Sequence, residues 1–137
     1  MRAAVGLLVS FGFLCLLGSG CDEVAASADG VCSLAVTNSY LECAVRDVSG
    51  TDIAILCLAP PGMCPGHFDI SPAQVRQLKN CKMLLRFDFQ QGIEDRLARL
   101  REGGLDVQQV QPTGGLCVPD TYLAVCRQVC QVLSRAY

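Results

Sequence analysis

The chain has 137 residues, which is the size of a single domain. Its formal net charge is −2, and the sequence contains no basic stretch of the kind that binds nucleic acid. Hydrophobic residues make up 51% of the composition, enough for a buried core, and ten cysteines are an unusually high number.

The first 20 residues have the layout of a secretory signal peptide. Arg2 gives a positive start, residues 3–17 are apolar and uncharged, and small residues lead to Cys21. This ending is similar to a bacterial lipoprotein processing site, which predicts that Cys21 becomes the lipidated first residue. Ordinary cleavage nearby, with Cys21 free or in a disulfide, is the alternative. Either way we expect an exported protein, in the periplasm or at the cell surface.

Residues 21–30 are small and polar and predict a flexible tether, and residues 31–137 predict one folded domain. In that domain apolar runs alternate with segments of helical periodicity. The expected strands are residues 31–36, 53–58, 83–87 and 105–110. Helices are expected after each strand, in residues 39–49, 71–80, 93–102 and from 119 onward. This alternation predicts an α/β fold, with a parallel four-stranded sheet and helices on both faces.

Two of the helices have predicted amino-terminal caps. Ser39 and Glu42 match the capping-box pattern, and so do Ser71 and Gln74. Pro72 stands at the first position of the second helix, where proline is well tolerated. We therefore expect Ser39 and Ser71 to be the residues that cap these helices.

The segment of residues 59–70, which we call the His67 loop, contains three prolines and two glycines and is expected to be irregular. It leaves the carboxyl end of the second strand, on the edge where parallel sheets bind ligands. His67 is the one histidine of the chain, with Cys64 and Asp69 close by. Imidazole and thiolate are zinc ligands. Asp69 could hold the imidazole in place by a hydrogen bond without contacting the metal ion itself. An ordinary surface histidine is the alternative.

Residues 31–137 resemble the amino-terminal lobe of periplasmic zinc- and manganese-binding proteins of ABC transporters. That family carries a loop reading roughly Pro-Gly-x-Asp-Pro-His-x-Phe/Tyr-Glu-x-Thr/Ser-Pro. Residues 61–72 here read Pro-Gly-Met-Cys-Pro-Gly-His-Phe-Asp-Ile-Ser-Pro. The loop histidine is the family's first metal ligand, so the resemblance implies this role for His67. Cys64 replaces an acidic residue, and Gly66 is inserted before the histidine.

The resemblance also implies ligands that this sequence lacks. In the family a second histidine precedes a Trp-Leu-Asp-Pro stretch, whereas residues 114–119 here read Gly-Gly-Leu-Cys-Val-Pro. Cys117 is the nearby donor that could substitute. The remaining ligands of the family come from a second lobe, so we expect this chain to be a fragment or a single-lobed relative.

The other cysteines allow two interpretations. In an exported protein they could form disulfides, whose pairing the sequence leaves open. Cys32, Cys43, Cys57 and Cys126 lie in apolar segments, which favours buried small side chains. Cys126 and Cys130 are one helical turn apart. This spacing fits either two side chains that face the core or a pair that binds a metal ion.

These observations favour capture of a divalent metal ion, zinc first and manganese second, for delivery to an ABC permease in the membrane. No catalytic residue is predicted, because nothing marks a nucleophile. One alternative is a cysteine-rich lipoprotein that binds copper or performs thiol redox chemistry, although no Cys-x-x-Cys motif occurs. Another is a single-lobe interaction module that has lost metal binding.

Overall fold

The computed structural model describes residues 32–50 and 53–136. The predicted signal peptide, Cys21 and the tether lie outside the described residues. The elements in chain order are β1 (Leu34–Asn38), α1 (Ser39–Ser49), β2 (Ile55–Ala59), α2 (Pro72–Leu78), β3 (Met83–Phe87), the 3₁₀ helix η1 (Gln91–Ile93), α3 (Glu94–Glu102), β4 (Asp106–Val110) and α4 (Pro119–Ala136).

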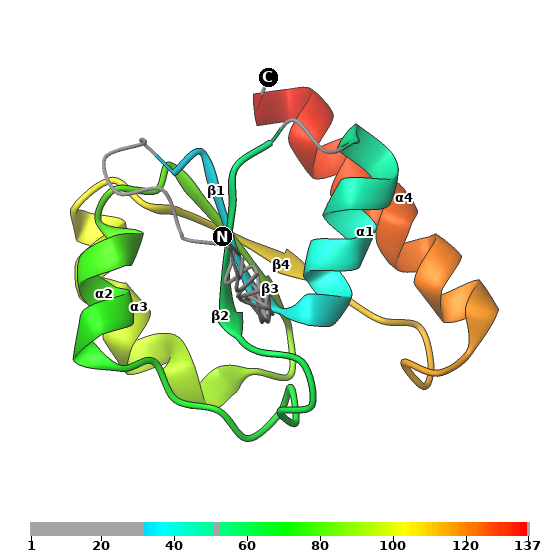
Figure 1. Ribbon diagram of the computed structural model, residues 1–137, viewed down its shortest axis with the longest axis horizontal. Coiled ribbons are helices and arrows are strands. Elements are labelled where there is room, and N and C mark those ends of the chain that lie inside the picture. Colours follow the sequence, from blue (N-terminus) through cyan, green and yellow to red (C-terminus); the bar gives the residue numbers. More distant parts are fainter. Residues whose placement is uncertain (1–31, 51–52, 137) are drawn as a thin grey trace, which may run out of the picture.

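The four strands form one parallel sheet in the order β2-β1-β3-β4. Figure 1 shows α1 and α4 on one face of this sheet and α2 and α3 on the other. The predicted fold class, a parallel four-stranded α/β sheet with helices on both faces, is therefore confirmed. None of the helices in the described ranges combines the length and apolar character that crossing a bilayer requires.

The sheet separates two hydrophobic cores. Leu34 and Val36 of β1 face the core beneath α1 and α4, whereas Ala35 faces the core beneath α2 and α3. This alternation follows from the two-residue period of a strand. All five residues of β1 and of β3 are buried, as expected for the central strands of a covered parallel sheet. Only one residue of β4 is buried, which agrees with its place at an edge.

β1 begins and ends later than the sequence predicted. It starts at Leu34, which pairs with Ile55 of β2 and with Met83 of β3. It continues through Thr37 and Asn38, which are polar but almost fully buried. The sequence prediction ended the strand before these residues because of their polarity, yet both have hydrogen-bond partners that make burial tolerable.

The predicted cap of α1 was wrong by one residue. Asn38 is the N-cap, and its Oδ1 accepts a hydrogen bond from the backbone N–H of Leu41 at 3.0 Å. Glu42 forms an ion pair with Arg46 at 2.8 Å along the helix. An asparagine caps as well as a serine, and here it stands directly at the end of a buried strand. The other predicted capping box, formed by Ser71 and Gln74, is confirmed.

The cap assignment can be tested by mutation. Asn38→Ala leaves the N–H of Leu41 without its acceptor, so we expect a loss of about 1 kcal/mol in the free energy of unfolding. Ser39→Ala is the matched control and is expected to change it by less than about 0.5 kcal/mol. Urea denaturation followed by circular dichroism measures both. Equal losses would show that Ser39 caps the helix after all.

Candidate functional site

The strand order places a topological switch point between β1 and β3. From β1 the chain proceeds to β2 on one side, and it then crosses to β3 on the other. The connections diverge there, and in open α/β sheets this is the place where ligands commonly bind. Thr37 and Asn38 end β1 at this edge, and Phe87 ends β3. We call this edge of the sheet the carboxyl rim.

The amide of Gln90 occupies the switch point. Its Oε1 accepts hydrogen bonds from the Thr37 hydroxyl and the Phe87 backbone N–H, both at 2.8 Å. Its Nε2 donates to the carbonyl of Pro65 at 2.6 Å. Gln90 is 3% exposed, so little water competes for these bonds. One buried amide thus connects the ends of β1 and β3 to the His67 loop.

The His67 loop is held at its other end as well. The Gln74 side chain donates to the Leu58 carbonyl at 2.5 Å, which brings the start of α2 to the end of β2. Ile70 is buried and Phe68 is half-buried in the core beneath α2 and α3. The loop therefore follows a defined course between two apolar contacts and two amide hydrogen bonds, although it has no regular structure.

Cys64 and His67 form a close donor pair at the outer turn of the loop. A hydrogen bond from His67 N–H to the Cys64 carbonyl, at 3.2 Å, closes this turn. The Cys64 Sγ lies 3.4 Å from the His67 Nδ1. This contact lowers the pKa of the Cys64 thiol below its usual value, with a further hydrogen bond from the Gly66 backbone. The exposed sulfur and the imidazole are donors that could both be reached by a metal ion from solvent.

Asp69 has other partners than the imidazole. Its carboxylate forms an ion pair with Arg96 of α3 at 2.6 Å and accepts a hydrogen bond from the N–H of Ile70 at 2.8 Å. These contacts fasten the loop to α3. The carboxylate of Asp69 is thus engaged with Arg96 and Ile70, and not with the His67 imidazole that it was expected to hold.

Cys117 lies on the same rim but on a different loop. That loop follows β4, whereas the His67 loop follows β2, and these two strands are the opposite edges of the sheet. In Figure 1 the two loops leave the sheet on its lower side and diverge, one toward α2 and the other toward α4. Within the described residues, no three His, Cys, Asp or Glu side chains gather as a metal site requires. The structure brings together Cys64 and His67 alone of the predicted ligands.

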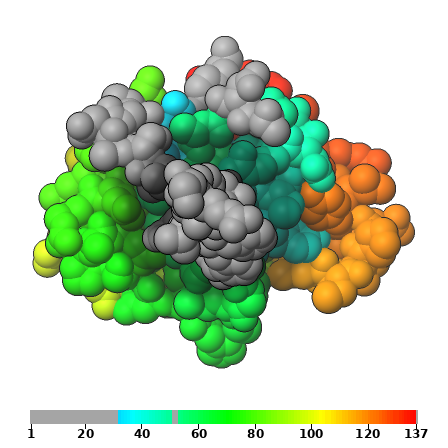
Figure 2. Space-filling model, in the orientation of Figure 1, coloured from blue at the N-terminus to red at the C-terminus, as the bar shows by residue number. Residues whose placement is uncertain are grey.

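Exposed apolar side chains accompany the donor pair. Met63 precedes Cys64, Phe89 follows β3, and Val118 precedes α4, and each is more than two-fifths exposed. Phe89 stacks on Phe87 with ring centroids 5.1 Å apart. Figure 2 shows the green atoms that follow β2 projecting from the lower edge of the molecule, apart from the orange atoms that lead into α4. The rim is an open surface with exposed apolar side chains and with one thiol and one imidazole close together.

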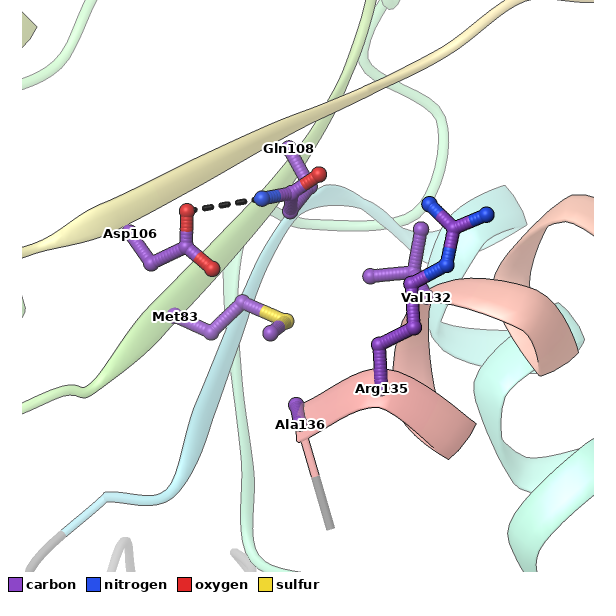
Figure 3. Close-up of a pocket in the computed structure, with 6 residues that line it drawn as sticks. All are labelled: Met83, Asp106, Gln108, Val132, Arg135 and Ala136. Carbon is purple, nitrogen blue, oxygen red and sulfur yellow. Dashed lines mark hydrogen bonds between the residues drawn. The ribbon is translucent and has the colours of Figure 1, made fainter.

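Two pockets in the described part of the chain lie at the opposite, amino-terminal ends of the strands. One of about 130 Å³ lies between β3, β4 and the last turn of α4 (Figure 3). It is lined by Met83, Asp106, Gln108, Val132, Arg135 and Ala136. A larger one, of about 510 Å³, lies where α2 and α3 lead into β3 and β4. Neither contains a residue of the His67 loop, so they are separate from the predicted site.

Gln90 and Arg86 are the important residues that the sequence prediction missed. The Arg86 side chain is 1% exposed, donates to the Phe87 carbonyl at 3.0 Å and forms an ion pair with Glu94 at 2.8 Å. It holds the turn that presents Gln90. A polar residue just beyond a predicted central strand is the signal that could have identified Gln90, since strand ends of this kind form the ligand edge.

Comparison with known proteins agrees on the fold. No family model matches the sequence, and no curated protein sequence matches it. Among solved structures, Zn(II)-bound AdcA from Streptococcus pneumoniae matches with a TM-score of 0.64 at 14% identity, over 79% of this chain and 27% of that one. A mutant Mn-bound periplasmic metal binding protein from Candidatus Liberibacter asiaticus matches with a TM-score of 0.59 at 10% identity, over 75% and 44%.

The Cd-bound form of the Liberibacter protein also matches, with a TM-score of 0.53 at 12% identity, over 76% of this chain and 46% of that one. The likeness is one of fold. The chain spans less than half the length of these structures, and so corresponds to a part of each. The α/β lobe predicted from the sequence is thus an architecture found in periplasmic metal-binding proteins.

The role of Gln90 can be tested with Gln90→Glu. The carboxylate can still accept from Thr37 and Phe87, but it cannot donate to the Pro65 carbonyl and repels it. We expect faster amide hydrogen exchange in residues 61–68 and a loss of roughly 1–3 kcal/mol in unfolding free energy. Hydrogen exchange with mass spectrometry measures the first, and urea denaturation the second.

Gln91→Glu is the matched control for this change. Gln91 is exposed and donates to the Asp88 carbonyl at 2.8 Å, so the same substitution affects only a surface contact. We expect no change in exchange of residues 61–68. If both variants leave exchange in this segment unchanged, the bond to Pro65 does not hold the loop.

The lowered pKa of Cys64 predicts its reactivity. More of this thiol is ionised at neutral pH than of an ordinary cysteine, and the thiolate is the reacting form. We expect iodoacetamide to alkylate Cys64 faster than Cys130, which is also exposed. His67→Ala should remove the difference. Peptide mass spectrometry over a time course gives both rates, and an unchanged Cys64 rate in His67→Ala would contradict the proposed effect of the imidazole.

Proposed function

We propose that this chain is one lobe of an exported solute-binding protein that captures a divalent metal ion for an ABC permease. The observation that carries the proposal is the exposed pair of Cys64 and His67, with Sγ and Nδ1 3.4 Å apart, on the ligand edge of the sheet. The fold likeness to Zn-, Mn- and Cd-bound proteins supports it. Lipidation at Cys21 would keep the protein close to its permease.

The donor types favour zinc as the metal ion. Manganese prefers carboxylate and water oxygens, whereas zinc accepts imidazole and thiolate in a tetrahedral site. The nearest carboxylate in the loop, that of Asp69, is bound to Arg96 at 2.6 Å. With sulfur and nitrogen as its free donors, the His67 loop suits zinc better than manganese.

Two donors are too few for a closed zinc site, which has about four protein ligands. Cys117 would have to approach from the opposite edge of the sheet, or further ligands would have to come from a second lobe facing the carboxyl rim. The exposed side chains of Met63, Phe89 and Val118 suit such a facing surface. We propose that the second lobe, or a partner protein in its place, completes the coordination.

Monovalent copper is a second candidate ligand. The lowered pKa of Cys64 and the exposed thioether of Met63 on the same loop favour a soft metal ion. This reading corresponds to a copper-binding lipoprotein rather than a zinc receptor. Competition between zinc and monovalent copper for the purified chain separates the two candidates.

Cobalt(II) titration tests the site directly, because cobalt takes zinc ligands and a bound thiolate adds a near-ultraviolet charge-transfer band. We expect this band in the unmodified chain and its loss in Cys64→Ser. Zinc affinity, measured by competition with a chromophoric chelator, should fall at least about ten-fold in both Cys64→Ser and His67→Ala. With two protein donors, the affinity of the chain itself is expected to be modest.

Cys130→Ser is the matched control, since it removes an exposed thiol of α4 that lies outside the His67 loop. Its cobalt band and zinc affinity should equal those of the unmodified chain. A band that survives in Cys64→Ser and disappears in Cys130→Ser or Cys117→Ser would place the metal elsewhere and overturn the proposed site.

A further inference from the structure

We propose that Cys32 and Cys81 form a disulfide bond, which joins the segment that leads into β1 to the segment that leads into β3. This inference concerns the end of the sheet opposite to the His67 loop. It does not depend on the proposed metal-binding function, and its test has a separate readout.

The register of the sheet places the two cysteines close to each other. Leu34 of β1 pairs with Met83 of β3, and the strands are parallel. Cys32 and Cys81 each stand two residues before this pair, so both lie just ahead of neighbouring strands. Neighbouring strands are separated by about 4.8 Å, and Cα atoms joined by disulfides are usually about 4.4–6.8 Å apart. Segments that enter neighbouring strands are therefore close enough to be bridged.

Both side chains turn to the same side of the sheet. Cys81 belongs to the core beneath α2 and α3 and is 6% exposed, and Cys32 packs against that same core. Leu34 and Met83, the residues two positions on, face the opposite core. Strand alternation alone would turn each cysteine to the same core as Leu34 and Met83, but both cysteines turn to the other core. This shared departure brings the two sulfurs to one place.

The two side chains belong to one apolar cluster. The interaction between the two thiols lowers the pKa of Cys32 and raises that of Cys81. The Cys32 Sγ also lies 3.1 Å from the Leu34 carbonyl, and the Cys81 Sγ 3.7 Å from the Gln77 carbonyl. One member of the pair is therefore ready to react as a thiolate, and the other is held within reach of it.

Oxidised glutathione, or a disulfide of the same chemical class on a thiol oxidoreductase, is the required oxidant. The Cys32 thiolate attacks one sulfur of that disulfide, and one glutathione thiolate leaves. Cys81, losing its proton, then attacks the Cys32 sulfur, and the second glutathione thiolate leaves. Two protein thiols are oxidised and one disulfide is reduced to two thiols. Cys32 is only partly buried, so an oxidant can reach the thiolate that attacks first.

Such a bond would close a loop of about 50 residues, from β1 through α2, and so restrict the unfolded chain. It would also remove two thiols from exchange with Cys64. The chemistry of the His67 loop and the covalent bond at the other end of the sheet would then coexist in an oxidising compartment.

Non-reducing peptide mapping tests the pairing. The purified full chain is equilibrated with reduced and oxidised glutathione, and the remaining thiols are trapped with iodoacetamide in denaturant. Trypsin isolates Cys81 on the peptide of residues 80–82, but it leaves Cys15, Cys21, Cys32 and Cys43 together. Chymotrypsin cuts after Tyr40 and Asp-N cuts before Asp22, so the two enzymes together isolate Cys32. We expect the peptide of Cys81 to be linked to that of Cys32, and linkage to Cys43 or alkylation of Cys81 under oxidising conditions would overturn the proposal.

A stability measurement gives an independent readout. We expect oxidation by glutathione to raise the midpoint of urea unfolding in the unmodified chain and in Cys130→Ser. The shift should be lost in Cys32→Ser and in Cys81→Ser. If oxidation shifts the midpoint of Cys81→Ser as much as that of the unmodified chain, another pair is responsible and the assignment is wrong.

Discussion

The buried amide of Gln90 is the contact on which the arrangement of the carboxyl rim depends. In a parallel sheet the carboxyl ends of all strands lie together, but the sheet itself does not hold the loops that follow these strands to one another. Gln90 joins them, because one oxygen accepts from Thr37 of β1 and from Phe87 of β3, while its nitrogen donates to Pro65 of the His67 loop. Its position is secured in turn by Arg86, which is buried in β3 and paired with Glu94 at the start of α3. The order of the His67 loop therefore derives from polar groups inside the protein.

This arrangement explains how an irregular loop can present two donors at a short separation. The loop is fixed by Gln90 at Pro65 and by Arg96 at Asp69, on either side of His67. Between these fixed points, a turn closed by the His67 N–H brings Sγ of Cys64 to within 3.4 Å of the imidazole. The Asp69 carboxylate is paired with Arg96. The unpaired donors of the loop are sulfur and nitrogen, on which the proposed preference for zinc over manganese rests.

Much of the fold follows from local pattern. The apolar run of residues 83–87 coincides with β3, and the Ser71 capping box begins α2 as predicted. The end of β1 and the cap of α1 were misplaced because Thr37 and Asn38 look like a strand end by polarity, whereas their hydrogen-bond partners allow their burial. Of the candidate site, the proximity of Cys64 and His67 was predictable because both belong to one turn. The separation of Cys117 was not, because it depends on the strand order, which alternation alone does not determine.

The distribution of the cysteines gives a further reason for regarding the carboxyl rim as the functional edge. Cys32 and Cys81 lie in one apolar cluster at the amino-terminal ends of β1 and β3, where sulfur can serve the stability of the sheet. Cys64 lies at the other end, exposed and beside an imidazole, where sulfur contributes nothing to a core. A thiol in that position is costly to keep reduced in an oxidising compartment unless something occupies it. Under the proposed function, a metal ion held there would protect the thiolate, and the exposed side chain of Met63 on the same loop suits a second surface that would exclude water. On that proposal, the open rim would be half of a site whose sulfur and nitrogen donors are in place before the other half arrives.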